Sequence, residues 1–209
     1  MIETTMEIKS VGKDIKCRDQ LVEEVVEVHL SAFPNFFLST LGTGFLKSYY
    51  CCFAKHDNGN LIIAIHDGKV VAFAAATSVC RGFNTSLLKQ NMLVFGWCFI
   101  KLLFTKPMAI VRLAKNLTKT SEKVKDDEDY AELYSIGTTA IVQGKGIGTQ
   151  LMKRLEKQLK EQGVKKISLT TDYINNEATL SFYKKNGFSV LYEFVTYPNR
   201  KMYRLIKTI

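Results

Sequence analysis

The sequence predicts an α/β fold, and three observations support that prediction. Stretches with strand and helix periodicity alternate along the 209 residues. Two apolar runs meet at Asp67-Gly68, a dipeptide typical of a tight β-hairpin. Residues 133–155 lead from a β-rich stretch through a glycine-rich turn into an amphipathic helix. The length suits one domain spanning 1–209, because a chain of this size can bury a sizeable core.

The first half of the chain is predicted to contain a strand, two helices and the hairpin. Asp19 stands at the N-cap position of the first helix, whose apolar residues recur at helical spacing. A loop that contains Pro34 separates this helix from the second one. The expected elements are a strand at 5–11, helices at 19–32 and about 43–55, a loop at 33–42 and the hairpin within 61–78.

The second half is predicted to alternate strands and helices around the glycine-rich turn. The helix that follows the turn has Leu151, Leu155 and Leu159 on one face and charged residues between them. Gly163 is placed to end it, since glycine readily adopts the left-handed conformation at a helix C-terminus. The elements expected next are a strand at 165–171, a helix within 175–188 and closing strands at about 188–196 and 201–207.

The glycine-rich turn has the features of an anion site. Gly144, Gly146 and Gly148 let backbone N–H groups point at phosphate oxygens beside the positive end of a helix. The spacing of a P-loop fails at Val142, where its second glycine would stand. The dinucleotide fingerprint fails at Thr149, where its third glycine would stand. A phosphorylated ligand is therefore expected, held by a different loop.

Two patterns resemble the signatures of the GNAT superfamily of N-acyltransferases. The pattern Q-x-x-G-x-G, read as Gln143, Gly146 and Gly148, resembles the family's acyl-CoA pyrophosphate loop. Residues 175–188 resemble its second signature, N-x-x-A-x-x-F-Y-x-x-x-G-F. The residues in register are Asn176, Phe182, Tyr183, Gly187 and Phe188, and Thr179 stands where alanine is usual.

The resemblance implies both a fold and an activity. The fold would be GNAT-like, with a central mixed sheet of α+β character, flanking helices, and a helical insertion between the third and fourth strands at about 81–130. The activity would be that of an N-acetyltransferase, which moves an acetyl group from acetyl-CoA to a primary amine of a small molecule by direct attack. No metal is expected.

The same resemblance implies the coenzyme site. Backbone N–H groups from Gln143 to Gly148 would hold the pyrophosphate, with Lys145 adding charge and Thr149 a hydroxyl. Strand residues from Gly137 to Val142 would pair with the pantetheine amides, in a splay between two parallel strands, and Asn176 would bond the pantetheine arm. The predicted coenzyme site comprises Ile136, Gly137, Thr138, Ile141, Val142, Gln143, Gly144, Lys145, Gly146, Ile147, Gly148, Thr149, Asn176 and Tyr183.

Two residues are the main candidates for proton transfer. Tyr183 would be the general acid for the departing thiolate, since a phenol can donate at neutral pH; the alternative is a core aromatic beside Phe182. Glu132, at the start of the phosphate-loop strand, would deprotonate the amine through water; the alternative is an exposed strand-end acid. Asp172, which follows the next strand, is a second candidate for the base, but it is assigned more readily to structure, as a cap or turn residue before Asn175. Water and backbone carbonyls are the remaining alternative for the base.

The cysteines and histidines indicate neither a disulfide framework nor a metal site. The five cysteines, an odd number without metal-ligand spacing, are Cys17, Cys51, Cys52, Cys80 and Cys98. The adjacent Cys51 and Cys52 are interpreted as small core or helix residues. The first residues, MIETTMEIKSVGKDIK, lack the apolar region of a signal peptide, which predicts a cytoplasmic protein.

Positive charge concentrates in the insertion. Residues 81–125 contain nine Lys or Arg and one acid, against a net charge of +9 for the chain. The apolar stretch 87–104 is interrupted by Lys89 and Lys101, so it is not expected to span a bilayer. Three interpretations remain: a helical pair over the sheet edge or against a second subunit, a lid on the acceptor site, and a membrane-surface helix with peripheral contact through 87–119. Nucleic acid is disfavoured, because no binding motif accompanies the charge.

The acceptor is the least constrained feature. Residues 29–50 are similar to relatives from bacterial surface-glycan biosynthesis, which implies an amino-sugar acceptor, nucleotide-linked or lipid-linked. The alternative is that Phe33, Phe36, Phe37 and Leu41 simply cover the sheet. The main alternative to catalysis is an acyl-CoA-binding or membrane-surface interaction module that keeps the coenzyme loop without turnover.

Overall fold

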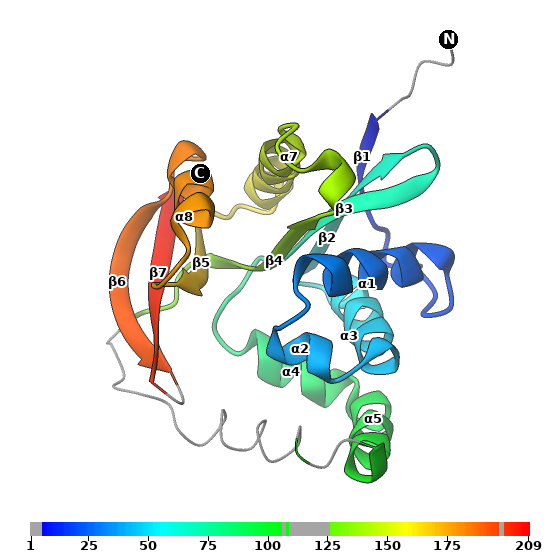
Figure 1. Cartoon of the computed structure of the whole chain (residues 1–209). Helices are drawn as coiled ribbons and strands as arrows, with labels where there is room; N and C mark the ends of the chain where they lie inside the picture. Colours follow the sequence, from blue (N-terminus) through cyan, green and yellow to red (C-terminus); the bar gives the residue numbers. More distant parts are fainter. Residues whose placement is uncertain (1–5, 106–107, 109–125, 197–198) are drawn as a thin grey trace.

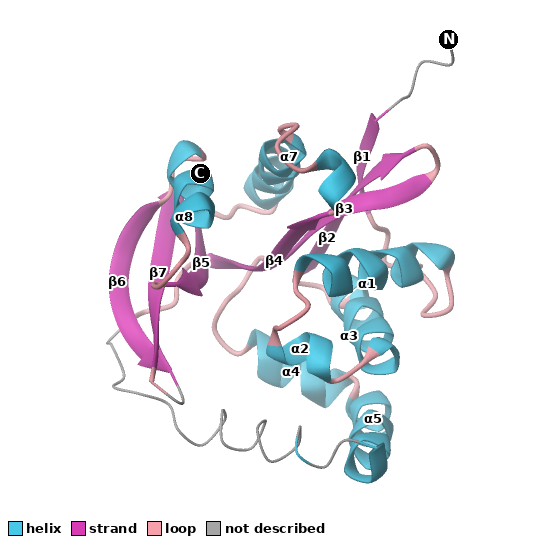
Figure 2. Cartoon of the chain, in the orientation of Figure 1, coloured by secondary structure: helices cyan, strands magenta, loops and turns pink. Residues whose placement is uncertain are grey.

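A seven-stranded sheet with helices on both faces forms the described part of the protein (Figures 1 and 2). The computed structural model describes residues 6–105, 108, 126–196 and 199–209. The strand order is β1-β2-β3-β4-β5-β7-β6, and only the β4–β5 pair is parallel within it, which confirms the mixed α/β sheet. The strands are β1 (Met6–Ser10), β2 (Gly59–His66), β3 (Lys69–Thr77), β4 (Ala131–Thr138), β5 (Lys166–Asp172), β6 (Ser189–Thr196) and β7 (Arg200–Thr208).

The helices divide between the two faces of the sheet, and each face has its own apolar core (Figure 1). On one face α1 and α3 pack against Phe73 of the central strand β3, and on the other α7 and Tyr183 of α8 pack against Ile167 of β5. The helices are α1 (Gln20–Ala32), α2 (Phe37–Thr40), α3 (Thr43–Lys55), α4 (Phe83–Gln90), α5 (Met92–Thr105), α7 (Ile147–Glu161) and α8 (Glu177–Lys185), with a 3₁₀ turn, η1, at Ala140–Val142.

Several predicted boundaries are confirmed, and one predicted loop is wrong. α3 runs over Thr43–Lys55, as expected, and Asp67 and Gly68 form the hairpin turn with positive φ angles of 51° and 75°. Asp19 occupies the N-cap position of α1, but its carboxylate accepts the backbone N–H of Lys16 instead of capping the helix. The predicted loop at 33–42 contains the short helix α2.

The expectation of no disulfide is wrong. Cys17, in the loop before α1, is bonded to Cys51 in α3, and their Cα atoms lie 5.1 Å apart. The pairing arises because α1 and α3 pack side by side, which brings together residues 34 positions apart in the sequence. Cys52, Cys80 and Cys98 are free thiols. Disulfides are rare in reducing compartments, so the cytoplasmic location stays a prediction.

The insertion between β3 and β4 is helical, as predicted, over its described part. α4 and α5 meet at an angle of 87°. Among the described helices, none alone is long and apolar enough to cross a bilayer, and only α4 and α5 taken together reach that length and composition. Residues 106, 107 and 109–125, which include the rest of the 87–119 segment, lie outside the described residues.

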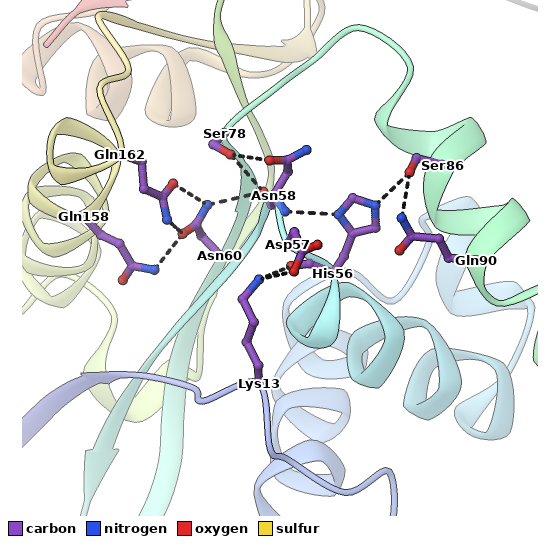
Figure 3. Close-up of polar contacts among 10 residues, drawn as sticks. All are labelled: Lys13, His56, Asp57, Asn58, Asn60, Ser78, Ser86, Gln90, Gln158 and Gln162. Carbon is purple, nitrogen blue, oxygen red and sulfur yellow. Dashed lines mark hydrogen bonds and ion pairs between the residues drawn. The ribbon is translucent and has the colours of Figure 1, made fainter.

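A polar network fixes α4 and α7 to the start of β2 (Figure 3). Asn60, 1% exposed, accepts hydrogen bonds from the side-chain amides of Gln158 and Gln162 of α7 through its Oδ1. His56, at the end of α3, places its Nε2 3.0 Å from the hydroxyl of Ser86 in α4. The insertion is therefore attached to the domain by a buried histidine as well as by apolar contacts.

Candidate active site

β4 and β5 separate soon after they meet, and a bulge marks the point of separation. Their parallel pairing covers only Ala131–Leu133 against Ile167–Leu169. Beyond it, β4 continues to Thr138 paired with β3 alone, and the register with β3 shifts so that Tyr134 is the extra residue. A strand edge without a partner leaves backbone donors and acceptors free, and bulges are frequent beside active sites. The diverging strands form an open edge on β4, which we call the splay edge, from Tyr134 to Thr138.

The glycine-rich loop follows the splay edge and presents unpaired amides at the start of α7. Gly144 and Gly146 have φ angles of 76° and 79°, a backbone conformation that glycine adopts without strain. The first turn of α7 has no acidic residue and no side-chain cap. Within the described residues, five backbone N–H groups donate no hydrogen bond: those of Gly144, Gly146, Ile147, Gly148 and Thr149. They converge at the positive end of a helix, which is the arrangement that binds phosphate.

The strand predicted to run through Gly137–Val142 is shorter than expected. It ends at Thr138, and Ala140–Val142 forms η1 instead. Val142 is 2% exposed in the core beneath α7, whereas Ile141 is 68% exposed. Ile136, Gly137 and Thr138 therefore lie on the splay edge, while Ile141 and Val142 belong to the turn that leads into the loop. The run Ala-Ile-Val resembles a strand in sequence, which explains the error.

The two sequence signatures lie in contact. A Cβ atom added at Gly148 would lie 3.1 Å from the ring of Phe182 in α8, closer than side chains normally approach. The amide of Asn186, just after α8, lies 3.5 Å from the hydroxyl of Thr149. Gly148 is thus needed for the close packing of α7 against α8, and this packing places the phosphate-type loop beside Tyr183.

Tyr183 has a buried ring and an accessible hydroxyl. Its side chain is 8% exposed, and its ring meets those of Phe182 and Phe188 at centroid distances of 5.2 and 5.7 Å. Its hydroxyl has no hydrogen-bond partner among the described residues. Unlike the unpaired oxygens there that are fully buried, it keeps some exposure to solvent. Burial raises the pKa of Tyr183, so the phenol stays protonated at neutral pH. It is a proton donor available to a ligand.

A model of the acetyltransferase (GNAT) family matches residues 22–188, which is most of the chain. The chain belongs to this family. Enzymes of the GNAT family are acyl-CoA-dependent N-acetyltransferases, and acetyl-CoA is their co-substrate. Among the described residues, no group of three or more His, Cys, Asp or Glu is placed to hold a metal ion.

Solved structures share the GNAT fold at low sequence identity. The ribosomal-protein-S18-alanine N-acetyltransferase of Escherichia coli is 15% identical, with a TM-score of 0.60, and the match covers 98% of this chain and 94% of that one. PaiA N-acetyltransferase of Thermoplasma acidophilum, in complex with coenzyme A, is 15% identical, with a TM-score of 0.59 and coverages of 98% and 99%. An aminoglycoside 6'-acetyltransferase type Ii is 14% identical, with a TM-score of 0.61 and coverages of 97% and 96%.

The sequence comparison does not narrow the choice among acceptor classes. The chain is 37% identical over 62 residues to YxbD, an uncharacterized protein of Bacillus subtilis (strain 168). That match spans 30% of this chain and 37% of the length of this curated relative. The acceptors in the names of the structural neighbours range from a ribosomal-protein alanine to an aminoglycoside, so the fold does not choose among them.

The two carboxylates that the sequence suggested as bases, Glu132 and Asp172, are already engaged in ion pairs in this GNAT protein. Glu132 forms an ion pair with Arg204, with side chains 15% and 13% exposed, and accepts a hydrogen bond from the thiol of Cys80. It is therefore not the exposed strand-end acid of the alternative interpretation. Asp172 forms a two-pronged ion pair with Arg200, at the start of β7. Its carboxylate is therefore engaged in this ion pair, which is a different structural role from the predicted cap or turn residue.

Asn176 closes the turn after β5. Its side-chain amide donates to the hydroxyl of Thr171 at 2.7 Å and to the carbonyl of Asp172 at 2.8 Å. Both of its N–H bonds are thus used inside the protein, and only its Oδ1 remains to meet a ligand. No pattern in the sequence indicated these internal partners.

The loop between α1 and α2 crosses the front of the splay. At one end, a Cβ added at Gly137 would lie 3.1 Å from the ring of Phe33, so the loop rests on β4. At the other end, the guanidinium of Arg200 lies 5.6 Å from the ring centroid of Phe36, which is 47% exposed. The loop therefore joins β4 to β7 across the gap that β5 leaves.

A buried polar chain supports the bulge, and sequence reasoning missed it. His29 Nδ1 lies 2.6 Å from the hydroxyl of Tyr50, which lies 3.3 Å from the hydroxyl of Ser135, next to the bulge. His29 and Tyr50 are 2% and 0% exposed. These residues come from α1, α3 and β4, so no spacing in the sequence links them. The nearby hydroxyl of Tyr134 is buried without a partner among the described residues.

His29 is expected to make stability depend on acid pH. Burial lowers the pKa of His29 to about 4, against about 6.5 in the unfolded chain. The unfolded state therefore binds more protons between these values, so stability is complete above pH 6.5 and falls as the pH drops toward 4. The free energy of unfolding falls by roughly 3 kcal/mol across this pH range. Denaturant titrations across this window should show this loss of stability. His29→Gln should reduce the loss and leave the share of His56, whose pKa burial also lowers, whereas His66→Gln, at the end of β2, should retain it.

Proposed function

We propose that the protein transfers an acetyl group from acetyl-CoA to a primary amine of a small molecule by direct attack, with Tyr183 as the general acid. The observation that carries this proposal is the continuous run from the splay edge of β4 to the five free amides at α7. Acetyl-CoA supplies the thioester-activated acetyl group. Transfer of radiolabelled acetyl groups to an amine panel, with coenzyme thiol release measured in parallel, tests the activity.

Each part of the site has a task in this proposal. The free N–H groups around Gly146 and Gly148 hold the pyrophosphate, and Lys145 adds a positive charge. Backbone groups of the splay edge bind the pantetheine amides as a neighbouring strand would. Tyr183 donates its phenolic proton to the coenzyme sulfur as the carbon–sulfur bond breaks, and the tyrosinate then takes up the proton that the attacking amine has released to solvent.

Glu132 is the general base in this proposal, and it acts through a water molecule. Its position beside the bulge supports the assignment, because its charge adds to burial in raising the pKa of Tyr134. Arg204 occupies one oxygen of the carboxylate, and the thiol of Cys80 donates to the other. A direct contact with the amine is thus replaced by a relay through water.

Glu132→Gln is expected to lower kcat/KM for the amine by about 10²- to 10⁴-fold at neutral pH, because general-base catalysis typically contributes that much. The loss should shrink as pH rises, since more of the amine is then already neutral. A pH series of kcat/KM measures this. Arg204→Gln provides the control, because it removes the same ion pair and keeps the Glu132 carboxylate. If both variants show the same pH profile, the carboxylate serves the ion pair and is not the general base.

The acceptor we propose is an amino sugar, nucleotide-linked or lipid-linked, which is the acceptor expected from the sequence of residues 29–50. The α1–α2 loop supports this choice, because Phe36 presents an exposed aromatic face beside the splay. The amine panel should include nucleotide-linked and free amino sugars, aminoglycosides, amino acids and peptide N-termini. Preference for peptides or amino acids would reject the sugar. A cytoplasmic location accompanies the proposal, since acetyl-CoA is an intracellular metabolite.

A further inference from the structure

The outward surface of α5 is apolar to an unusual degree. Leu93 and Phe104 are 88% and 85% exposed, and no acidic residue occurs in α4 or α5. Monomeric proteins rarely leave such a contiguous surface open to water. Leu93, Trp97, Ile100 and Phe104 follow one another at helical spacing. The α5 face, as we call it, comprises Met92, Leu93, Val94, Trp97, Phe99, Ile100, Leu103 and Phe104.

The α5 face is separate from the candidate active site. α5 attaches through its opposite side, where Phe95, Cys98 and Leu102 are buried and Phe95 lies 6.0 Å from the ring of Phe45 in α3. α5 lies beyond α3, on the side of the sheet opposite to α7 and its glycine-rich loop (Figure 1). Coenzyme binding therefore leaves this face uncovered.

The charges around the α5 face indicate the kind of partner. Lys89 and Lys101 are the charged residues of α4 and α5, and the Lys101 ammonium lies 5.4 Å from the ring centroid of Trp97. Along the sequence, the segment 81–125 that contains both helices has nine basic residues and one acid. Two copies joined through this face would bring like charges together, whereas an anionic surface would satisfy the cations and the apolar side chains at once.

We propose that the α5 face docks the protein on an anionic lipid surface. Leu93 and Phe104 would enter the boundary between headgroups and acyl chains, where Trp97 and Lys101 combine an apolar body with a polar end. Lipid fits better than a folded protein partner, because the apolar surface is convex and wraps around the helix instead of forming a pocket. The helix lies on the membrane in this proposal and does not cross it.

Trp97 permits a direct test, because it is the one tryptophan of the chain. Vesicles of phosphatidylglycerol and phosphatidylcholine should shift its emission to shorter wavelength and carry the protein into the pellet on centrifugation. Pure phosphatidylcholine vesicles should bind it about tenfold or more weakly, and added salt should reduce the difference. Equal binding to both vesicles would reject an anionic surface, and no binding to either would reject lipid altogether.

A matched pair of double variants locates the contact. Leu93→Glu with Phe104→Glu should lower vesicle partitioning by about tenfold or more, since two large apolar side chains are replaced by acids. Leu191→Glu with Val195→Glu, which alters residues 43% and 41% exposed on β6, should bind like the wild type. Both variants should keep the wild-type melting temperature and coenzyme affinity, so a failure of lipid binding is distinguished from a failure of the acetyltransferase proposal.

Light scattering without vesicles tests the competing occupant. A monomer agrees with the lipid proposal. The result against it would be a wild-type dimer that does not bind vesicles and that becomes a monomer in the Leu93→Glu, Phe104→Glu variant. The α5 face would then be an interface between two copies.

Discussion

Tyr183→Phe is expected to lower kcat by about 10²- to 10⁴-fold while leaving coenzyme affinity unchanged. The substitution removes one hydroxyl from a ring that packs against Phe182 and Phe188 and keeps the ring itself. Because that hydroxyl has no partner among the described residues, its loss leaves no unpaired group behind and stability should stay near wild type. Thiol release, calorimetric titration with coenzyme A and thermal unfolding measure the three quantities.

The control for Tyr183 is Tyr173→Phe, which removes a partly exposed hydroxyl beyond β5 and preserves the ring stacked on Tyr203. It should retain wild-type turnover. The pH profile offers an independent check: since burial raises the pKa of Tyr183 above its ordinary value near 10, the wild type should show no loss of activity from tyrosine ionisation below about pH 10. Wild-type turnover in Tyr183→Phe would make Tyr183 a core aromatic and assign the proton to solvent.

Gly146→Val is expected to weaken coenzyme A binding by on the order of 100-fold. Gly146 caps α7 in a left-handed conformation, with φ 79° and ψ 3°. A β-branched residue there is strained by about 1–2 kcal/mol and would turn its own N–H and those of the next residues away from the pyrophosphate. The loss of two or three charge-assisted hydrogen bonds accounts for the size of the effect. Calorimetric titration with coenzyme A measures it.

The chain contains a close match for this position. Gly82 caps α4 with φ 75° and ψ −1°, and at both glycines an added Cβ would have no neighbour within 4 Å. Gly82→Val should therefore cost about the same stability, since the backbone strain is the same, and leave coenzyme affinity intact. Equal affinity losses in the two variants would mean that general destabilisation, and not the loop, is being measured. Wild-type affinity in Gly146→Val would overturn the coenzyme loop.

The fold was predictable where local signals agree with tertiary structure. α3 and the hairpin at Asp67-Gly68 follow from periodicity and turn chemistry, and the glycine-rich turn followed by an apolar-faced helix fixes α7. The shorter β4 was not predictable, because Ala140–Val142 has strand-like residues and becomes a turn only when Val142 enters the core under α7. Local pattern and packing disagree at that point.

The candidate site was predictable only where one segment carries it. Gly144 to Thr149 are consecutive, so the loop was visible in the sequence, as was Tyr183 within its own signature. The partners that modify these residues come from distant segments: Arg204 reaches Glu132 across 72 positions, and Tyr50 reaches Ser135 across 85. The bulge at Tyr134 depends on the register of β4 against β3, which one strand cannot reveal. Cys17 and Cys51 also come from distant segments, and they meet only because α1 packs beside α3.

The short junction between β4 and β5 gives the co-substrate a second role. Three residue pairs are all that connect β1–β4 to the β5–β7–β6 block within the described sheet. In the proposed binding mode, the pantetheine arm lies where β4 and β5 no longer pair. The arm then supplies hydrogen bonds that a continued strand pairing would otherwise make. Loading the enzyme then strengthens the fold, and releasing the spent coenzyme weakens it again. In each catalytic cycle, the association between β1–β4 and the β5–β7–β6 block would therefore strengthen when the co-substrate binds and weaken when the coenzyme leaves.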